Sequence, residues 1–179
     1  MKSKNSFYLI LLVLLLISVS KIAFCQNDEI IWNKWNYLIG SWKGEGEGKP
    51  GEGSGYFSFS KDLDSKILIR KNHSEYPATN DRPQIIHDDL MIVYLDAEFK
   101  PFKAIYFDNE NHVINYSINY NDVNGSIIFI SEPSDNSPRF RLTYIKLNEN
   151  NLKIKFEFAP PGKPESFTIY LEGKAYKEK

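Results

Sequence analysis

One segment constrains the architecture more than any other: Leu38-Ile39-Gly40-Ser41-Trp42-Lys43-Gly44-Glu45-Gly46-Glu47-Gly48. Read with a period of two, Trp42 shares one face with three glycines, whereas Lys43 shares the other face with two glutamates. Charge on one face and a large aromatic residue on the other predict a half-buried strand. Glycine weakens a strand, so the glycine run indicates a bulge, a tight barrel corner, or the close approach of a ligand or another backbone.

The residues before this segment predict one short α-helix. Its apolar residues recur with helical spacing, and they are Ile31, Trp35, Leu38 and Ile39. Asn27 or Asp28 can cap its start, and Gly40 is a natural end. A helix of two to three turns is marginal alone, so we expect it to pack on the rest of the domain.

The N-terminus has the features of an export signal. Two lysines near the start precede an apolar run, 7–17, that is too short to span a bilayer comfortably. Ala23 and Cys25 then supply small residues at the −3 and −1 positions of a cleavage site. We therefore expect residues 1–25 to be a signal peptide and residues 26–179 to be one exported domain, either periplasmic or secreted.

Cys25 allows two interpretations. It is either the last residue of a removed signal peptide or the lipid-carrying first residue of a bacterial lipoprotein. Lipoprotein signals prefer a small residue just before the cysteine, and Phe24 in that position favours removal. In either case residues 26–179 contain no cysteine for a disulfide, so the stability of the domain must come from its core.

Composition and charge exclude several classes of partner. Charged residues make up 25% and hydrophobic residues 42% of the chain, which is typical of a globular domain. Loss of residues 1–25 removes three lysines and no acidic residue, so the net charge moves from −1 to −4. A negative domain does not favour nucleic acid or an anionic membrane surface as a partner. No second apolar segment is long enough to cross a bilayer, and we expect a monomer.

The rest of the chain consists of alternating segments separated by turns. Besides the opening segment, the expected strands cover 55–61, 66–75, 85–95, 101–107, 112–120, 126–131, 139–147, 152–158 and a last one from 167 towards the C-terminus. About ten short antiparallel strands must protect their edges, and an up-and-down barrel does so by closing on itself. A sandwich is the alternative, but an uninterrupted meander without long crossovers favours the all-β barrel preceded by one short helix.

A helix, then Gly-x-Trp opening a strand, then a closing meander resembles the calycin superfamily of lipocalin-like barrels. The segment from Leu38 to Gly48 looks like the opening of the nitrobindin-like haem-binding barrels, ten-stranded relatives of fatty-acid-binding proteins. Two later segments resemble exported bacterial proteins with lipocalin-like domains, and they are Arg70-Lys71-Asn72-His73 and Tyr106-Phe107-Asp108-Asn109-Glu110-Asn111-His112-Val113-Ile114. Nitrobindin-like barrels hold haem iron through a histidine near the C-terminal end, and no histidine follows His112 here. The resemblance therefore carries over no haem ligand.

A barrel of this size either fills its interior with side chains or holds one small ligand. The candidate ligand-binding residues are Trp42, Arg70, His73, His87, His112, Tyr116 and Arg141. In fatty-acid-binding relatives an inward Arg with a Tyr captures a carboxylate, and Arg141 with Tyr144 or Tyr170 is a candidate for this role. Alternation places Arg141 and Tyr144 on opposite faces, so an outward Arg141 on a solvated face remains the alternative.

The three histidines have spacings that fit no metal signature. Strand-edge histidines beside acids are usually solvated or hydrogen-bonded, although His73 and His112 are placed to line a barrel mouth. The sequence also has no nucleophile elbow, no phosphate-binding glycine loop and no His-Glu-x-x-His, so we assign no catalytic residue, no metal site and no cofactor.

The sequence thus predicts an exported barrel that binds a small hydrophobic or amphipathic molecule without a covalent bond. The alternative is a filled barrel that acts as a structural or interaction module. A haem-binding barrel or a small enzyme on a calycin fold is the remaining option.

Overall fold

The structure is a computed structural model that describes residues 32–45, 53–96, 101–133 and 136–178. The expected signal peptide, Cys25, the expected helix cap and the glycines Gly46 and Gly48 lie outside these residues. The chain divides into two units, one ending at Asn36 and one beginning at Tyr37, and each is described by itself.

The described part of the first unit is a single turn of 3-10 helix, η1 (Asn33–Trp35). The amide of Trp35 donates to the carbonyl of Trp32 at 2.9 Å, which is the i to i+3 pattern of a 3-10 turn. The Trp32 and Trp35 rings pack edge to face, with centroids 5.9 Å apart, and both side chains are buried.

The prediction of an α-helix of two to three turns ending at Gly40 was wrong for the residues that the structure describes, because none of them is α-helical. In an α-helix the carbonyl of Leu38 would accept the backbone amide of Trp42. Here it accepts the Trp42 indole Nε1 at 2.8 Å instead, while Gly40 has a φ of +117° and turns the chain into the first strand. None of the described helical segments is long and apolar enough to cross a membrane.

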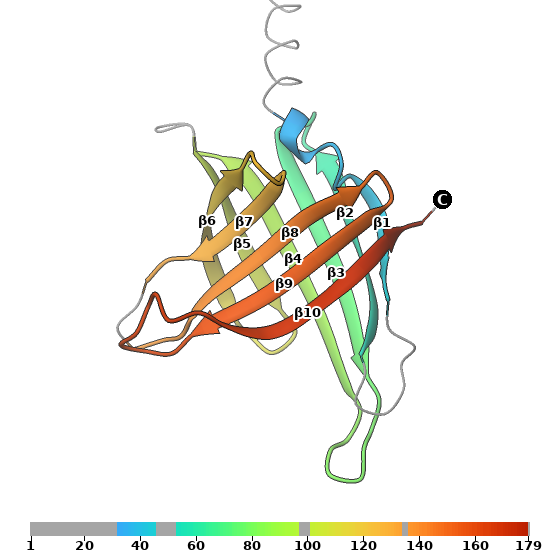
Figure 1. Cartoon of the computed structure of the whole chain (residues 1–179), viewed down its shortest axis with the longest axis vertical. Coiled ribbons are helices and arrows are strands. Elements are labelled where there is room, and N and C mark those ends of the chain that lie inside the picture. Colours follow the sequence, from blue (N-terminus) through green and yellow to red (C-terminus); the bar gives the residue numbers. More distant parts are fainter. Residues whose placement is uncertain (1–31, 46–52, 97–100, 134–135, 179) are drawn as a thin grey trace, which may run out of the picture. The chain divides into compact units, whose positions relative to one another are not determined.

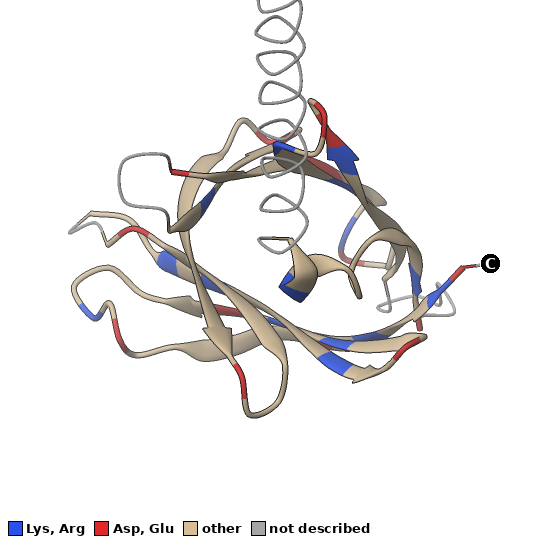
Figure 2. Ribbon diagram, turned by 90° about the horizontal axis from the view of Figure 1, so that it is seen from above, with Lys and Arg blue, Asp and Glu red and all other residues tan. Residues whose placement is uncertain are grey.

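In the second unit, the described residues form ten antiparallel strands that close into a barrel (Figure 1). The strands are β1 (Gly40–Gly44), β2 (Ser54–Asp62), β3 (Ile67–Tyr76), β4 (Ile85–Leu95), β5 (Phe102–Asp108), β6 (Val113–Asn121), β7 (Ser126–Ser131), β8 (Arg139–Asn148), β9 (Asn151–Ala159) and β10 (Thr168–Lys177). Each strand pairs with its neighbours in sequence, and β1 pairs with β10 to close the ring, which Figure 2 shows from above. The predicted all-β up-and-down barrel is confirmed.

In the described part of the first hairpin, glycine is required at Gly55 and not at Gly44. A Cβ added at Gly44 would lie 3.5 Å from the carbonyl oxygen of Gly55, which is an ordinary contact. A Cβ added at Gly55 would lie 2.5 Å from the carbonyl oxygen of His73, so only glycine allows β2 and β3 to approach this closely.

Contacts between distant strands identify the inner face. The rings of Phe57 on β2 and Tyr144 on β8 lie 5.6 Å apart, although these strands are not neighbours in the ring. Both side chains therefore lie inside the barrel. Phe59 is directly opposite Arg70, and Arg70 is opposite Met91, so alternation places all three on the same inner face.

The inner face differs between the two ends of the barrel. Towards the turns that join β2 to β3, β6 to β7 and β8 to β9, inner side chains are buried, and they include Phe59, Leu68, Val93, Ile127 and Leu152. Towards the opposite end, inner side chains remain partly exposed, and they include Asn72, His87, Tyr106, Ile114, Phe140, Phe156 and Phe158. Solvent therefore reaches the inner face from this second end.

Candidate functional site

A buried ion pair lies where the filled part of the barrel meets the accessible part. Arg70 on β3 donates through Nη1 to Asp89 Oδ1 on β4, and the two residues are 7% and 9% exposed. The guanidinium carbon lies 5.7 Å from the centre of the Phe57 ring. An isolated charge at such depth costs several kcal/mol, so the arginine and the carboxylate each require the other.

Beside this ion pair, the side chains of Arg70 and Tyr144 are neighbours in the barrel interior, and each affects the pKa of the other. Among the residues that the structure describes, neither Arg70 Nε nor the Tyr144 hydroxyl has a hydrogen-bond partner, although both atoms are fully buried. Burial raises the pKa of Tyr144 to about 12, with Arg70 acting in the opposite direction, so the phenol stays protonated at neutral pH. Burial lowers the pKa of Arg70, but its neighbours Tyr144 and Asp89 outweigh burial and leave this pKa raised. Both groups are therefore protonated at neutral pH, and the contact between the two side chains also raises the pKa of Arg70 and lowers that of Tyr144.

His87 links the ion pair to the surface. Its Nε2 lies 3.0 Å from the Tyr106 hydroxyl and 3.5 Å from Asp89 Oδ2, and its Nδ1 lies 3.0 Å from Glu110 Oε1. The hydrogen bond to Asp89, opposed by burial and reinforced by Glu110, raises the pKa of His87 to about 9. The imidazole is therefore charged at neutral pH, and it donates through both nitrogens.

The turn between β5 and β6 fixes the outer part of this arrangement. Tyr106 donates to Asp108 Oδ2 at 3.2 Å, and His112 Nδ1 lies 2.9 Å from the same oxygen. Asp108 Oδ1 accepts the backbone amides of Glu110 and His112. Burial alone would raise the pKa of Asp108, but these hydrogen bonds from His112 and Glu110 leave it lowered. We call Arg70, His87, Asp89, Tyr106, Asp108 and Glu110 the polar network.

An aromatic cluster occupies the opposite arc of the ring. Phe140 on β8 and Phe156 on β9 stack with centroids 5.7 Å apart. Tyr170 on β10 packs edge-on against Phe156 at 6.1 Å and against Phe158 at 6.3 Å. A register shift between Ile169 and Leu171 gives Tyr170 this position. We call Phe140, Phe156, Phe158 and Tyr170 the aromatic wall; all four remain partly or largely exposed.

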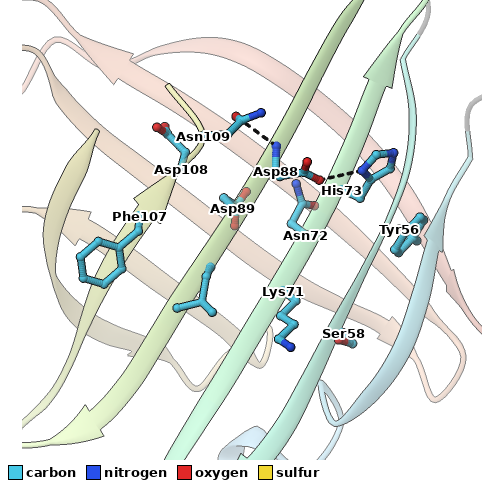
Figure 3. Close-up of a pocket in the computed structure, with 11 residues that line it drawn as sticks. Tyr56, Ser58, Lys71, Asn72, His73, Asp88, Asp89, Phe107, Asp108 and Asn109 are labelled. Atoms are coloured by element: carbon cyan, nitrogen blue, oxygen red, sulfur yellow. Dashed lines mark hydrogen bonds and ion pairs between the residues drawn. The ribbon is translucent and has the colours of Figure 1, made fainter. Parts of the chain in front are cut away.

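A concavity lies on the outer face of β2 to β5 and measures about 600 Å³ (Figure 3). Its side chains include Tyr56, Lys71, His73 and Phe107. His73 is paired with Asp88 at 2.7 Å and stacks on Tyr56 with ring centres 5.1 Å apart. The histidine of this concavity is thus already bonded to one of the carboxylates that line it, Asp88.

The predicted site residues divide between the two faces. Trp42, Arg70, His87 and Tyr116 lie on the inner face, and Trp42 and Tyr116 are buried there. His73 lies on the outer face, and His112 is exposed at the turn where it holds Asp108.

Arg141 is also outside. It binds Glu157 through two hydrogen bonds of 2.7 and 2.6 Å, and its guanidinium lies 4.2 Å from the centre of the Phe167 ring. The structure thus separates Arg141 from Tyr144, and it is Arg70 that lies near Tyr144.

Sequence reasoning missed Asp89, Tyr106, Asp108 and Glu110 as parts of one site. A signal for Asp89 was present, because it alternates with the apolar residues Met91 and Val93. A carboxylate on a face that points into the core requires a partner. Arg70 is likewise a charged residue on the same strand face as the buried Leu68. Among the described residues, no three His, Cys, Asp or Glu side chains are placed to hold a metal ion.

No protein-family model matches the chain, and the search of curated proteins gave no match. The closed ten-stranded antiparallel barrel is compatible with a calycin-type architecture.

Proposed function

We propose that this protein is an exported, lipocalin-like carrier that holds one small amphipathic molecule against the inner face of its barrel. The polar end of the molecule binds Arg70 Nε and the Tyr144 hydroxyl, and its apolar body lies on the aromatic wall. The observation that carries the proposal is the pair of buried donors without a partner. Removal from water of a donor that is left unsatisfied costs about 1–3 kcal/mol, so native proteins rarely keep two of them together.

The aromatic wall supports the apolar half of the proposal. Tyr144, Leu142 and Phe140 are successive inner positions of β8, and Tyr144 is buried whereas Phe140 is partly exposed. Four residues of a strand span about 13 Å, which suits a medium-length alkyl chain or a small ring system. Burial of this aromatic surface by a ligand contributes about 25 cal/mol per Å² removed from water.

The remaining parts of the proposal follow from the sequence. The N-terminal signal features favour export, and the resemblance to nitrobindin-like and fatty-acid-binding barrels favours small-molecule binding. We include no haem, because His87 is the histidine on the inner face and both of its ring nitrogens are engaged.

Binding of a fluorescent lipophilic probe tests the proposal. The full chain is expressed so that the host processes it, and the purified protein is titrated with Nile red. We expect saturable binding at one site, about tenfold weaker in Phe156→Ser because that change removes part of the aromatic wall.

Tyr56→Ser is the matched control, since Tyr56 is an exposed aromatic residue on the outer face. Absence of saturable binding, or equal weakening by both substitutions, contradicts the proposal.

A further inference from the structure

We infer that the polar group of the ligand is an uncharged hydrogen-bond acceptor, such as a hydroxyl or carbonyl, and that the site discriminates against carboxylates. This inference rests on the proposed function and names the chemical class of the molecule. Three features of the site carry it: the charge on Arg70 is already compensated, each neighbouring basic group is already paired with an acid, and the atoms without a well-formed hydrogen bond are donors.

Asp89 neutralises Arg70 before any ligand arrives. Its Oδ1 accepts from Arg70 Nη1, and its Oδ2 lies 3.5 Å from His87 Nε2. With 4% of its side chain exposed, Asp89 is held at the depth where charges interact most strongly. A carboxylate that approached Arg70 Nε would meet an ion pair rather than a free cation, with a like charge beside it.

The polar network contains three acids and two bases, His112 is a third base bound to Asp108, and every one of these bases already contacts an acid. Its cations are Arg70 and His87, and its anions are Asp89, Asp108 and Glu110. The lysines on the inner face among the described residues, Lys61, Lys146 and Lys177, lie at the other end of the barrel. Lys177 lies over the Trp42 ring. A further anion therefore loses its hydration without gaining an unpaired cation, which is the arrangement in which a buried charge is most costly.

The two buried donors determine which polar group of a ligand can bind here. Arg70 Nε is a donor only, and the Tyr144 hydroxyl is free to donate. One oxygen with two lone pairs, in a ketone, ester, amide or alcohol, accepts from both without bringing a charge. An ammonium has no lone pair and satisfies neither donor.

A set of ligands that differ only in the polar group tests this inference on the unaltered protein. Nile red is displaced at pH 8 with decanol, 2-decanone, decanoate and decylamine, each below its aggregation concentration. We expect decanol and 2-decanone to bind at least tenfold more tightly than decanoate and decylamine, which corresponds to about 1.4 kcal/mol.

Two substitutions identify the cause of the discrimination. Asp89→Asn leaves Arg70 uncompensated and is expected to raise the affinity for decanoate at least tenfold, whereas Asp88→Asn, on the outer face, leaves it unchanged. Tyr144→Phe removes one donor and is expected to weaken decanol binding about fivefold. If Asp89→Asn does not fold, the four-ligand comparison on the unaltered protein and the decanol affinity of Tyr144→Phe still test the inference.

The outcomes separate this inference from the proposed function. Decanoate binding as tightly as decanol overturns the inference and leaves the carrier proposal intact. Affinities for decanol and 2-decanone that do not change in Tyr144→Phe also overturn it, because the two donors then serve only a buried water. Absence of displacement by every ligand, together with no binding of Nile red, overturns the carrier proposal itself.

Discussion

Two arginine–carboxylate pairs on this barrel differ in how completely they are bonded. Outside, Arg141 holds Glu157 through two hydrogen bonds and lies over the Phe167 ring. The contact with Arg141 lowers the pKa of Glu157. Inside, Arg70 contacts Asp89 through Nη1 and leaves Nε without a partner among the described residues. In the outer pair two guanidinium nitrogens bind the carboxylate, as expected of a structural contact. In the inner pair Arg70 Nε is buried without a hydrogen bond to a described residue, which costs free energy.

The comparison predicts its largest effect at Asp89. Asp89→Ala leaves Arg70 buried without a partner, so the free energy of unfolding falls by about 3–5 kcal/mol, measured by urea denaturation. The double substitution Arg70→Met with Asp89→Leu removes both charges and is expected to restore most of this loss. A loss below about 1 kcal/mol for Asp89→Ala would show that the inner pair contributes no more than a surface pair.

The second effect concerns pH. The folded-state pKa of His87, about 9, lies above the ordinary value of 6.5. The stabilisation that results is complete below pH 6.5 and is lost as the pH rises through 9. Because His87 is partly exposed, we expect the free energy of unfolding to fall by about 2 kcal/mol between pH 6.5 and pH 9.5. Urea denaturation at several pH values measures this, and His87→Gln should flatten the profile.

A smaller effect is expected at the outer pair. Arg141→Ala removes a guanidinium that is about one-third exposed, and its loss opens a path for water to Glu157, whose side chain is 9% exposed while Arg141 is present. The free energy of unfolding should fall by about 1 kcal/mol, and ligand affinity should not change. Urea denaturation and Nile red titration of the same variant provide both measurements. A loss as large as that of Asp89→Ala would remove the distinction between the two pairs.

The smallest effect on stability is expected at Tyr144. Because its hydroxyl has no partner among the described residues, Tyr144→Phe deletes an unsatisfied group and keeps the ring contacts with Phe57 and Phe59. The free energy of unfolding should change by less than about 0.5 kcal/mol without ligand, even though decanol binding weakens. A loss of stability above about 1 kcal/mol in thermal or urea unfolding would mean that the hydroxyl is already bonded in the folded protein.

The barrel was predictable because its strands and hairpins are specified by residues that are close together in the sequence. Alternation in segments such as Ile85–Leu95, with turn residues between segments, predicts strands and hairpins, and a meander of ten strands closes most simply on itself. The N-terminal helix was mispredicted because the spacing of Trp35 and Leu38 reflects burial of large side chains rather than helical geometry.

The site was less predictable because it depends on pairs that are distant in sequence. Arg70 follows Ile69, and Arg141 lies between Phe140 and Leu142, so each arginine has an apolar neighbour in sequence. Only the register between strands shows that Arg70 faces inward. The register shift beside Tyr170 changes which residues of β10 face inward, and the alternation of the sequence does not predict it. Tyr144 and Arg70 likewise come close only because the barrel is closed, since their strands, β8 and β3, are not paired.

The seam between β1 and β10 also bears on how the chain folds. Its pairing at Trp42 and Lys177 joins the two extremes of the barrel sequence, whereas every other strand pair is a local hairpin. Closing so long a loop costs more entropy than closing any hairpin, so we expect this seam to form last. Trp42 lies on the seam and becomes fully buried there, so quenching or a blue shift of its fluorescence would mark the moment when an open sheet becomes a barrel.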